Sequence, residues 1–356
     1  MIDRIDVLRK LLPEKCAALV TSDINRFYLT SFKSSAGVVV ITKKSAYLLV
    51  DFRYFEAAKK LESDILSVVC YKKQIDAINE IIKEEEVNSL VVEKSSVTLA
   101  EFEFYKDNLN VQINNIEFSL SDALLKMRCV KSDEEIINIT NAQKIAEKSY
   151  TELLNYIKVG VSEYDIAVEL EYLMRKYGAE RPAFDTIAVS GKNSSLPHGV
   201  PSDKLLQEGD FLTLDFGAVY NGYHSDMTRT VAIKYATDEM KKVYDVVFEA
   251  HKCAAQVINS GLSCADVDLA ARKYIVDCGY GDYFGHSTGH GVGLEIHEKP
   301  TVYKTNENVL ESGMIITVEP GIYIPDKFGI RIEDMYLVTD DGAVDLAVID
   351  KELIIL

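Results

Sequence analysis

The chain has 356 residues, which is long enough for two domains that each bury a hydrophobic core. Its 39 Lys and Arg against 56 Asp and Glu give a formal net charge of −17, which argues against nucleic acid and anionic membranes as partners, because phosphate groups need a positive surface. The charged start, M-I-D-R-I-D, and the lack of any apolar run of membrane-spanning length predict a cytoplasmic protein without a signal peptide.

The first third of the chain alternates apolar strand-like runs with helical stretches. The expected strands are Ala17–Val20, Gly37–Ile41, Tyr47–Val50 and Ile65–Cys70, and the expected helices lie around residues 53–62, 75–86 and 99–108. This order predicts an α/β domain over residues 1–122, in which no ligand-like cluster is visible. The remaining residues, 123–356, are expected to form a second domain.

The second domain contains a repeat. Ser132 to Glu135 is a capping box that starts a helix, and a second helix starts at Ser162 and stops at Gly178. About a hundred residues later the same signals return: a helix starts near Thr237, and another starts at Ser263 and stops at Gly279. One helix–helix–strand–strand unit is therefore used twice, and two facing copies would set their side chains around one central cleft.

Each copy carries two acids in apolar, strand-like surroundings: Asp215 and Asp226 in the first, Glu319 and Glu333 in the second. A single acid of this kind is ordinarily a surface residue or half of an ion pair. Four of them in repeated contexts, with His290 between the pairs, predict a site for two divalent cations, because an unpaired buried carboxylate costs several kcal/mol. Oxygen donors with one imidazole suit manganese, and also cobalt or zinc, without a thiolate.

The other histidines and neighbouring polar residues have alternative interpretations. His251, on a helix, is expected to be a satisfied structural residue, whereas His224 shares a strand face with Asp226 and is left open. His198 follows a proline in a turn, which favours a functional role. Arg331 shares a face with Glu333 and is expected to orient it. Three tyrosines would line a pocket or only pack: Tyr220, Tyr223 and Tyr323.

The six cysteines, at positions 16, 70, 129, 253, 264 and 278, are scattered. Their spacing matches neither a disulfide framework nor a thiolate metal site. We therefore expect reduced and mostly buried thiols in a reducing compartment.

Five motifs in order carry a resemblance that covers nearly the whole chain. They are F-D-T-I-A-V-S-G-K-N-S-S-L-P-H-G, L-D-F-G-A-V-Y-N-G-Y-H-S-D-M-T-R-T, G-H-S-T-G-H-G-V-G-L-E-I-H-E, V-E-P-G-I-Y and R-I-E-D. With them the chain resembles the prolidase and aminopeptidase P branch of the pita-bread metallopeptidases. The resemblance implies a creatinase-like N-terminal α/β domain and an α+β pita-bread C-terminal domain built from two pseudo-symmetric halves. It also implies a homodimer.

The resemblance implies a role for each site residue. Asp226 and Glu333 would bridge both metals, Asp215 would complete one, and His290 with Glu319 would complete the other. Bridging carboxylates hold two cations about 3.5–4 Å apart, and a hydroxide that bridges both cations would be the nucleophile. Glu319 would also carry the proton between that water and the leaving nitrogen.

Three histidines complete the expected catalytic set. His297 and His198 would stabilise the oxyanion and the substrate carbonyl, with His286 as a helper near the metals.

The expected substrate is a small peptide with an Xaa-Pro bond, and Xaa-Pro dipeptidase activity is favoured over the alternative, aminopeptidase P activity on longer peptides. A dipeptidase needs a cation for the carboxylate of proline, for which Lys299 and Lys304 are candidates unless they are plain surface residues. Methionine aminopeptidases usually lack the large N-terminal domain. A non-catalytic binding protein on this fold should have lost at least one ligand, and none is lost.

Overall fold

The computed structural model describes residues 2–356 and divides into two compact units, separated between Arg128 and Cys129. The domain join predicted between residues 122 and 123 lies within helix α6 (Leu120–Cys129). Each unit has hydrophobic side chains buried in a core of its own. The predicted fold class is confirmed: an α/β unit is followed by an α+β unit built from two related halves.

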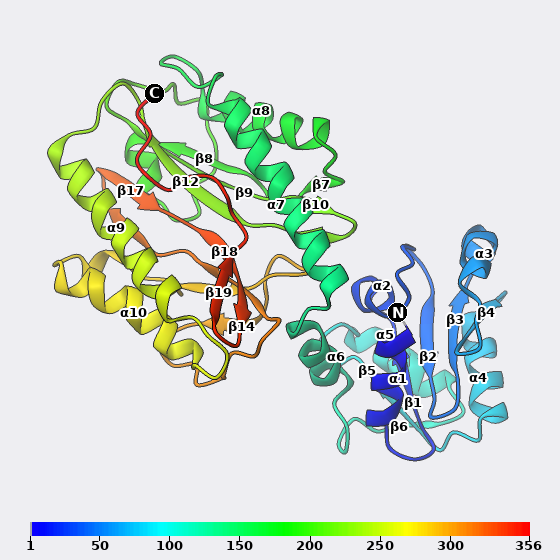
Figure 1. Ribbon diagram of the computed structural model, residues 1–356. Coiled ribbons are helices and arrows are strands. Elements are labelled where there is room, and N and C mark those ends of the chain that lie inside the picture. The colour runs from blue at the N-terminus through cyan, green and yellow to red at the C-terminus, as the bar shows by residue number, and fades with distance from the viewer. Residues whose placement is uncertain (1) are drawn as a thin grey trace. The chain divides into compact units, whose positions relative to one another are not determined.

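The first unit is a six-stranded sheet in the order β4-β3-β2-β1-β5-β6, with helices between the strands (Figure 1). β1 runs antiparallel to β2 and parallel to β5, so the sheet is mixed. Its strands are β1 (Cys16–Val20), β2 (Val38–Ile41), β3 (Ala46–Val50), β4 (Leu66–Cys70), β5 (Ser89–Val92) and β6 (Gln112–Ile113). Its helices are α1 (Ile2–Leu11), α2 (Asp23–Thr30), α3 (Phe52–Ala58), α4 (Gln74–Glu84) and α5 (Leu99–Asn108).

The four predicted strands and three predicted helices of this unit are confirmed to within a few residues. The sequence did not indicate α1, α2 or β5. Ser22 caps α2 by accepting from Asn25 N, and the surrounding polar side chains are buried: the fully buried Glu93 accepts hydrogen bonds from Ser22 Oγ at 2.7 Å and from Asn25 Nδ2 at 2.7 Å. A run of polar residues is ordinarily interpreted as a solvent-exposed loop, so the sequence did not indicate a helix here.

The first half of the second unit pairs two helices with two small sheets. The sheet orders are β11-β10-β7 and β12-β9-β8. The helices are α7 (Asp133–Leu153) and α8 (Glu163–Lys176), and the strands are β7 (Arg181–Pro182), β8 (Ile187–Ser190), β9 (Phe211–Phe216), β10 (Ala218–Tyr220), β11 (Tyr223–His224) and β12 (Met227–Ala232).

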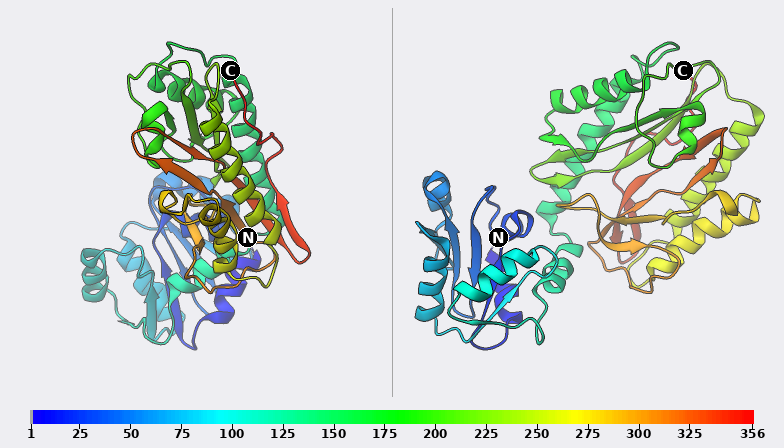
Figure 2. Two further views of the ribbon diagram at one scale, coloured as in Figure 1. Left: turned by 90° about the vertical axis from the view of Figure 1, so that its left-hand side faces the viewer. Right: turned by 180° about the vertical axis from the view of Figure 1, so that it is seen from behind.

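The second half has the same plan with a larger sheet, β14-β13-β15-β18-β19, and a separate ribbon of β16 with β17. Its helices are α9 (Asp238–Val257) and α10 (Cys264–Asp277). Its strands are β13 (Gly289–Gly291), β14 (Glu298–Val302), β15 (Ile315–Val318), β16 (Gly321–Ile324), β17 (Phe328–Arg331), β18 (Asp334–Thr339) and β19 (Gly342–Asp345). The strands of both halves lie between the pair α7 and α8 and the pair α9 and α10 (Figures 1 and 2).

The predicted repeat is confirmed in detail. The side chains of Ser162 and Ser263 cap α8 and α10 in the same way, each by accepting from the backbone three residues on. Gly178 and Gly279, after the two helices, have φ angles of 104° and 88°, a left-handed conformation that glycine adopts without strain. The same backbone hydrogen bond occurs at the corresponding position of each half. Gly160 N donates to Leu206 O in the first half, and Gly261 N donates to Leu310 O in the second.

Two further expectations concern membranes and thiols. Within residues 2–356 no helix combines the length and the apolar character that crossing a membrane requires. All six cysteines are free, as predicted, but the expectation of mostly buried thiols is wrong: only Cys16 and Cys264 are buried, and Cys70 and Cys278 are exposed. Cys70 ends the edge strand β4, where alternate side chains point to solvent.

Candidate metal centre

Three predicted metal ligands meet in the second unit. Each of Asp226, His290 and Glu333 offers one ligand atom, and these atoms all lie within 4.8 Å of one another. Asp226 and Glu333 are buried, and His290 is partly buried. The cluster draws on both halves of the repeat, as the sequence predicted.

The other two predicted ligands adjoin this cluster. Glu319 Oε1 lies 3.5 Å from His290 Nε2, which is also 3.5 Å from Asp226 Oδ2. Asp215, in β9, pairs in register with Thr228 of β12, and its Oδ2 accepts a hydrogen bond from Arg331 Nη2 at 2.6 Å. The second oxygen of Asp215, Oδ1, is buried without a hydrogen-bond partner among the described residues.

Three of the four acids lie where the chain passes from one sheet to another, and not inside strands as their apolar contexts suggested, whereas Asp215 lies within β9. Asp226 connects β11 to β12, Glu319 follows β15 before β16, and Glu333 connects β17 to β18. At such a transition the ladder hydrogen bonds are interrupted, so the side chain can turn towards the opposite half. The alternation rule therefore gave the neighbourhood of the site correctly but not the local conformation of its acids.

An isolated β-bridge between Thr228 and Glu333 links the two halves beside the cluster. Glu333 N donates to Thr228 O at 3.1 Å, and Thr228 Oγ1 donates to Glu333 Oε2 at 2.7 Å. The same hydroxyl oxygen accepts from Arg331 Nε at 3.1 Å. Arg331 therefore contacts Asp215 directly and acts on Glu333 through Thr228.

A close approach of two strands positions His290. A Cβ on Gly289 would overlap the carbonyl oxygen of Thr317, so glycine is needed for β13 to lie this close to β15. Thr317 Oγ1 accepts from His290 N at 3.1 Å and donates to Glu319 Oε1 at 3.4 Å. This threonine fixes the histidine and the glutamate relative to each other.

The acids of the cluster destabilise one another when they are charged. Burial, together with the charges of Asp215 and Glu319, raises the pKa of Asp226 well above its usual range. Burial and the charges of Asp226 and Glu319 do the same to the pKa of Glu333. Burial raises the pKa of Glu319 to about 7, although Arg331 lowers it and Asp215 raises it further. The cluster thus has more negative charge than Arg331 offsets.

His290 is neutral in this environment. Burial lowers its pKa to about 4. Its Nδ1 lies 3.0 Å from the carbonyl oxygen of Gly291, so the ring proton belongs on Nδ1 and the lone pair on Nε2 faces Asp226 and Glu319. A lone pair that faces two carboxylates is unfavourable unless a proton or a cation lies between them. The donor set of carboxylate oxygens and one imidazole nitrogen fits a divalent metal ion.

His286 belongs to a hydrogen-bond relay. Its Nδ1 donates to Ser287 O at 2.7 Å, so Nε2 accepts from the hydroxyl of Tyr323 at 2.9 Å. Tyr323 in turn accepts from Arg331 Nη1 at 2.7 Å. Burial, followed by the charge of Arg331, lowers the pKa of His286 to about 4, so this ring is also neutral. Of the three tyrosines considered, Tyr323 is the one that joins the site through this relay.

The other two predicted histidines present their rings to solvent beside the cluster. The ring of His297 lies edge-on to that of His290, with centroids 4.4 Å apart. His198 is exposed, and its loop is tied to the site because Pro197 O accepts from Arg331 Nη1 at 3.2 Å. Both rings are thus available to a molecule that approaches the acids.

Some candidates have contacts elsewhere. His224 Nδ1 lies 3.2 Å from Gly293 O and its Nε2 lies 3.3 Å from Arg181, while burial, then Arg181, lowers its pKa to about 4. The hydroxyl of Tyr223 donates to Glu135 at 3.1 Å. Lys299 and Lys304 are exposed, and Lys304 lies over the ring of Tyr303.

His251 is buried on α9, and the expectation that its polar atoms are satisfied is wrong. Among the described residues its two ring nitrogens have no hydrogen-bond partner, and the nearest acid is Asp334, with Nε2 to Oδ2 at 3.6 Å. Burial lowers the pKa of His251 to about 3, so this ring is neutral and does not form a charged pair.

The sequence reasoning missed the buried acids that hold the histidine loops. Glu163, fully buried on α8, accepts from Ser190 N at 2.6 Å and from Ser202 Oγ at 2.6 Å, and these residues flank the loop of His198. Asp268 on α10 accepts from Thr288 N at 3.1 Å, between His286 and His290. Glu163 and Asp268 lie on helices at some distance in sequence from the loops that they hold, and no local signal distinguishes such a buried acid from a solvated one.

Comparisons with known proteins agree with this geometry. Residues 138–340 match Metallopeptidase family M24, and residues 4–130 match the Creatinase/Prolidase N-terminal domain. An Xaa-Pro dipeptidase of Pyrococcus furiosus is 39% identical over 358 residues, covering 99% of this chain and 100% of that protein. The structure of an Xaa-Pro dipeptidase from Bacillus anthracis has a TM-score of 0.95 at 41% identity, covering 100% of this chain and 99% of that one. An X-Pro aminopeptidase from Thermotoga maritima has a TM-score of 0.89 at 34% identity, covering 96% and 97%.

Proposed function

Because the chain belongs to metallopeptidase family M24 and is a metal-dependent hydrolase, we propose that it cleaves Xaa-Pro peptide bonds at the cluster of Asp226, His290 and Glu333. One observation carries the proposal: a neutral imidazole directs its lone pair at a cluster of carboxylates whose negative charge Arg331 offsets only in part. Xaa-Pro dipeptidase activity is the favoured form. The names of the Pyrococcus and Bacillus relatives support it.

We propose two divalent ions, manganese before cobalt or zinc, held by the five predicted ligands. Asp226 and Glu333 would contact both ions, Asp215 would complete one, and His290 with Glu319 the other. The unpartnered Oδ1 of Asp215 and the mutual repulsion of the acids support this assignment. When bound, the ions would supply a hydroxide nucleophile near neutral pH and Lewis-acid polarisation of the scissile carbonyl.

The protein's own groups move protons and orient the substrate. Glu319 would take and return a proton at Oε2, since its Oε1 already accepts from Thr317. The exposed rings of His297 and His198 would donate to the oxyanion and to the substrate carbonyl. Arg331 would hold the carboxylate of Asp215 in its orientation, and the Tyr323–His286 relay would hold the arginine in place.

Three further expectations remain proposals: a homodimer, a cytoplasmic location and manganese as the native ion. Six free cysteines support a reducing compartment. Sedimentation of the purified protein would test the dimer, and elemental analysis of protein purified without chelator would identify the ion.

The dipeptidase proposal predicts how fast related peptides are cleaved. A dipeptidase recognises the free carboxylate of proline with a cation, and an amide at that position leaves the cation unpaired and desolvated. We expect kcat/KM for Ala-Pro to exceed that for Ala-Pro-amide and for Ala-Pro-Ala by at least ~10-fold, on the scale of one lost charged contact. Release of free alanine at matched enzyme and manganese concentrations measures all three rates.

Ala-Ala is the matched control, because it keeps both termini and changes only the residue after the scissile bond. It should be cleaved far more slowly than Ala-Pro. Equal or faster cleavage of Ala-Pro-Ala would instead assign aminopeptidase P activity, with the same metal ligands, and preference for Ala-Ala would contradict the Xaa-Pro assignment altogether.

A further inference from the structure

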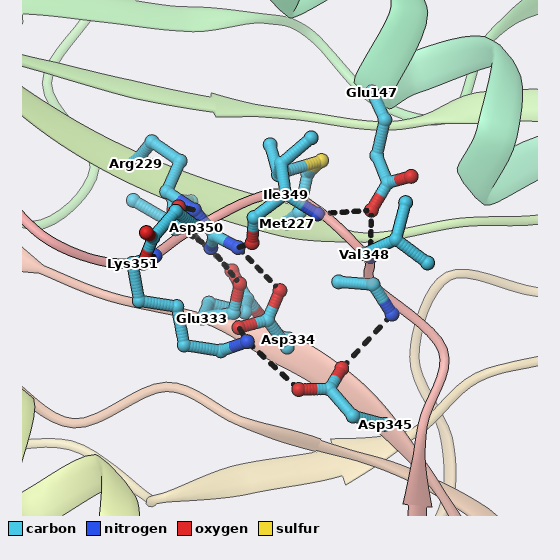
Figure 3. Close-up of polar contacts among 12 residues, drawn as sticks. Glu147, Met227, Arg229, Glu333, Asp334, Asp345, Val348, Ile349, Asp350 and Lys351 are labelled. Carbon is cyan, nitrogen blue, oxygen red and sulfur yellow. Dashed lines mark hydrogen bonds and ion pairs between the residues drawn. The ribbon is translucent and has the colours of Figure 1, made fainter.

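Arg229 is a fully buried arginine in β12, three positions after Asp226, with 2% of its surface exposed. A guanidinium has five N–H groups, and each of them has an acceptor here. Figure 3 shows the guanidinium among backbone carbonyls and one carboxylate. The acceptors are Thr228 O at 3.0 Å, Glu333 O at 2.8 Å, Asp334 Oδ1 at 2.8 Å, Ile349 O at 3.4 Å and Asp350 O at 3.2 Å.

Two of these acceptors define the junction between the halves. Thr228 and Glu333 form the β-bridge that joins the first half to the second, and Arg229 Nη1 binds the carbonyl oxygens of both. The hydroxyl of Thr228 holds the carboxylate of Glu333 on the cluster side. The side chain and the backbone of Glu333 are therefore fixed by different groups.

The other acceptors connect this junction to the end of the chain. Asp334, which pairs with Arg229, also lies 3.1 Å from Lys351 Nζ, and the same ammonium is 2.7 Å from Asp345 (Figure 3). Glu147 on α7 accepts from Val348 N at 2.6 Å. Residues 348–351 are thereby held between α7 and β18, with the carbonyls of Ile349 and Asp350 directed at Arg229.

A buried ion pair alone would be weak evidence for a specific role, since desolvation of both charges offsets much of their attraction. Here the guanidinium binds four carbonyls besides its acid, and a planar group with five directed donors tolerates little displacement of any of them. A lysine could keep the charge but could not replace this geometry. The arrangement therefore fixes the backbone of Glu333 more than it stabilises the core.

We propose that Arg229 is a positioning residue, itself held by residues 348–351. It fixes the backbone of Glu333 and thereby the affinity of the cluster for divalent cations. This inference rests on the proposed function. It assigns to the end of the chain a part in building the metal centre, through contacts that include none of the five predicted ligand side chains.

Arg229→Lys and Lys351→Met test the inference. Metal-free protein is titrated with Mn²⁺ by calorimetry, and cobalt-loaded protein is examined by its visible absorption, which reports ligand geometry. We expect Arg229→Lys to weaken Mn²⁺ binding by about 10- to 100-fold, the range typical of groups that orient metal ligands, and to change the cobalt spectrum. Lys351→Met, which removes one partner of Asp334, should weaken binding in the same direction by a smaller factor.

Arg26→Lys is the matched control. Arg26 is also buried, at 4% exposed, and donates to the backbone carbonyls of Thr21 and Ser34 in the first unit. The control should lower the midpoint of thermal unfolding of the metal-free protein but leave Mn²⁺ affinity and the cobalt spectrum unchanged.

The outcomes are distinguishable. Arg229→Lys with lowered thermal stability but wild-type Mn²⁺ affinity and an unchanged cobalt spectrum would reduce Arg229 to a structural role and overturn the inference. If Arg229→Lys does not fold, wild-type affinity in Lys351→Met has the same meaning, and weakened affinity supports the inference. Wild-type protein that binds no Mn²⁺ would contradict the proposed function itself and, with it, this inference.

Discussion

Glu319→Gln is expected to lower kcat for Ala-Pro by at least ~10²-fold, the scale of general acid–base catalysis. The substitution keeps the shape of the side chain and its contact with Thr317, but it removes the negative charge beside His290 and the group that moves the proton. Initial rates at saturating manganese separate the two losses, because weakened metal binding is overcome by added ion and a missing proton carrier is not. The variant should therefore remain slow at every manganese concentration.

Glu249→Gln provides the matched control. Glu249 lies on α9, is 41% exposed and pairs with Lys252 on the surface. Its loss should leave kcat within the error of the assay. A Glu319→Gln enzyme that reaches the wild-type rate in excess manganese would show that Glu319 is only a ligand, and the proton would have to be carried by another group.

Asp226→Asn is expected to abolish Mn²⁺ binding while making the metal-free protein more stable. Asp226 is buried, and its charge repels those of Asp215 and Glu319, so an uncharged side chain of the same shape relieves a strain that exists only without metal. Thermal unfolding of the metal-free proteins measures the effect, at roughly 2–4 °C for each kcal/mol. A metal-free variant that is less stable than metal-free wild type would contradict the repulsion inferred for the cluster.

The same repulsion has a pH dependence. In the metal-free protein the pKa values of Asp226 and Glu333 are raised above those of the unfolded chain, so the unfolded state loses these protons at lower pH. Their contribution to stability is present below a pH of about 4, the usual carboxylate range, and is lost as the pH rises above it. Asp226→Asn removes one of the two groups. The stability of the metal-free variant should therefore fall less steeply than that of metal-free wild type as the pH rises above about 4.

The sequence was most informative where the folding signal is local. Caps at Ser162 and Ser263 and stops at Gly178 and Gly279 depend on neighbouring residues only, and all four are found as predicted. The start of α2 was missed although Ser22 caps it by accepting from Asn25 N. Its further support comes from Glu93, about seventy residues away, and a long-range hydrogen bond leaves no pattern in the surrounding letters.

The same distinction holds for the site. Its acids could be predicted because the repeat shows them twice, and the structure brings Asp226, His290 and Glu333 together. Arg229 could not be recognised, because its acceptors beyond β12 lie 104 to 121 residues further along the chain. An arginine within the strand-like run M-T-R-T-V-A indicates that a buried partner exists, but it does not identify that partner.

The most direct test of the account is the activity of metal-free protein as manganese is returned to it. Protein is stripped with a chelator, its metal content is checked by elemental analysis, and hydrolysis of Ala-Pro is followed during titration with Mn²⁺. The account predicts no measurable hydrolysis without metal and full recovery as two ions bind to each chain. Full hydrolysis of Ala-Pro by protein shown to contain no metal would contradict it.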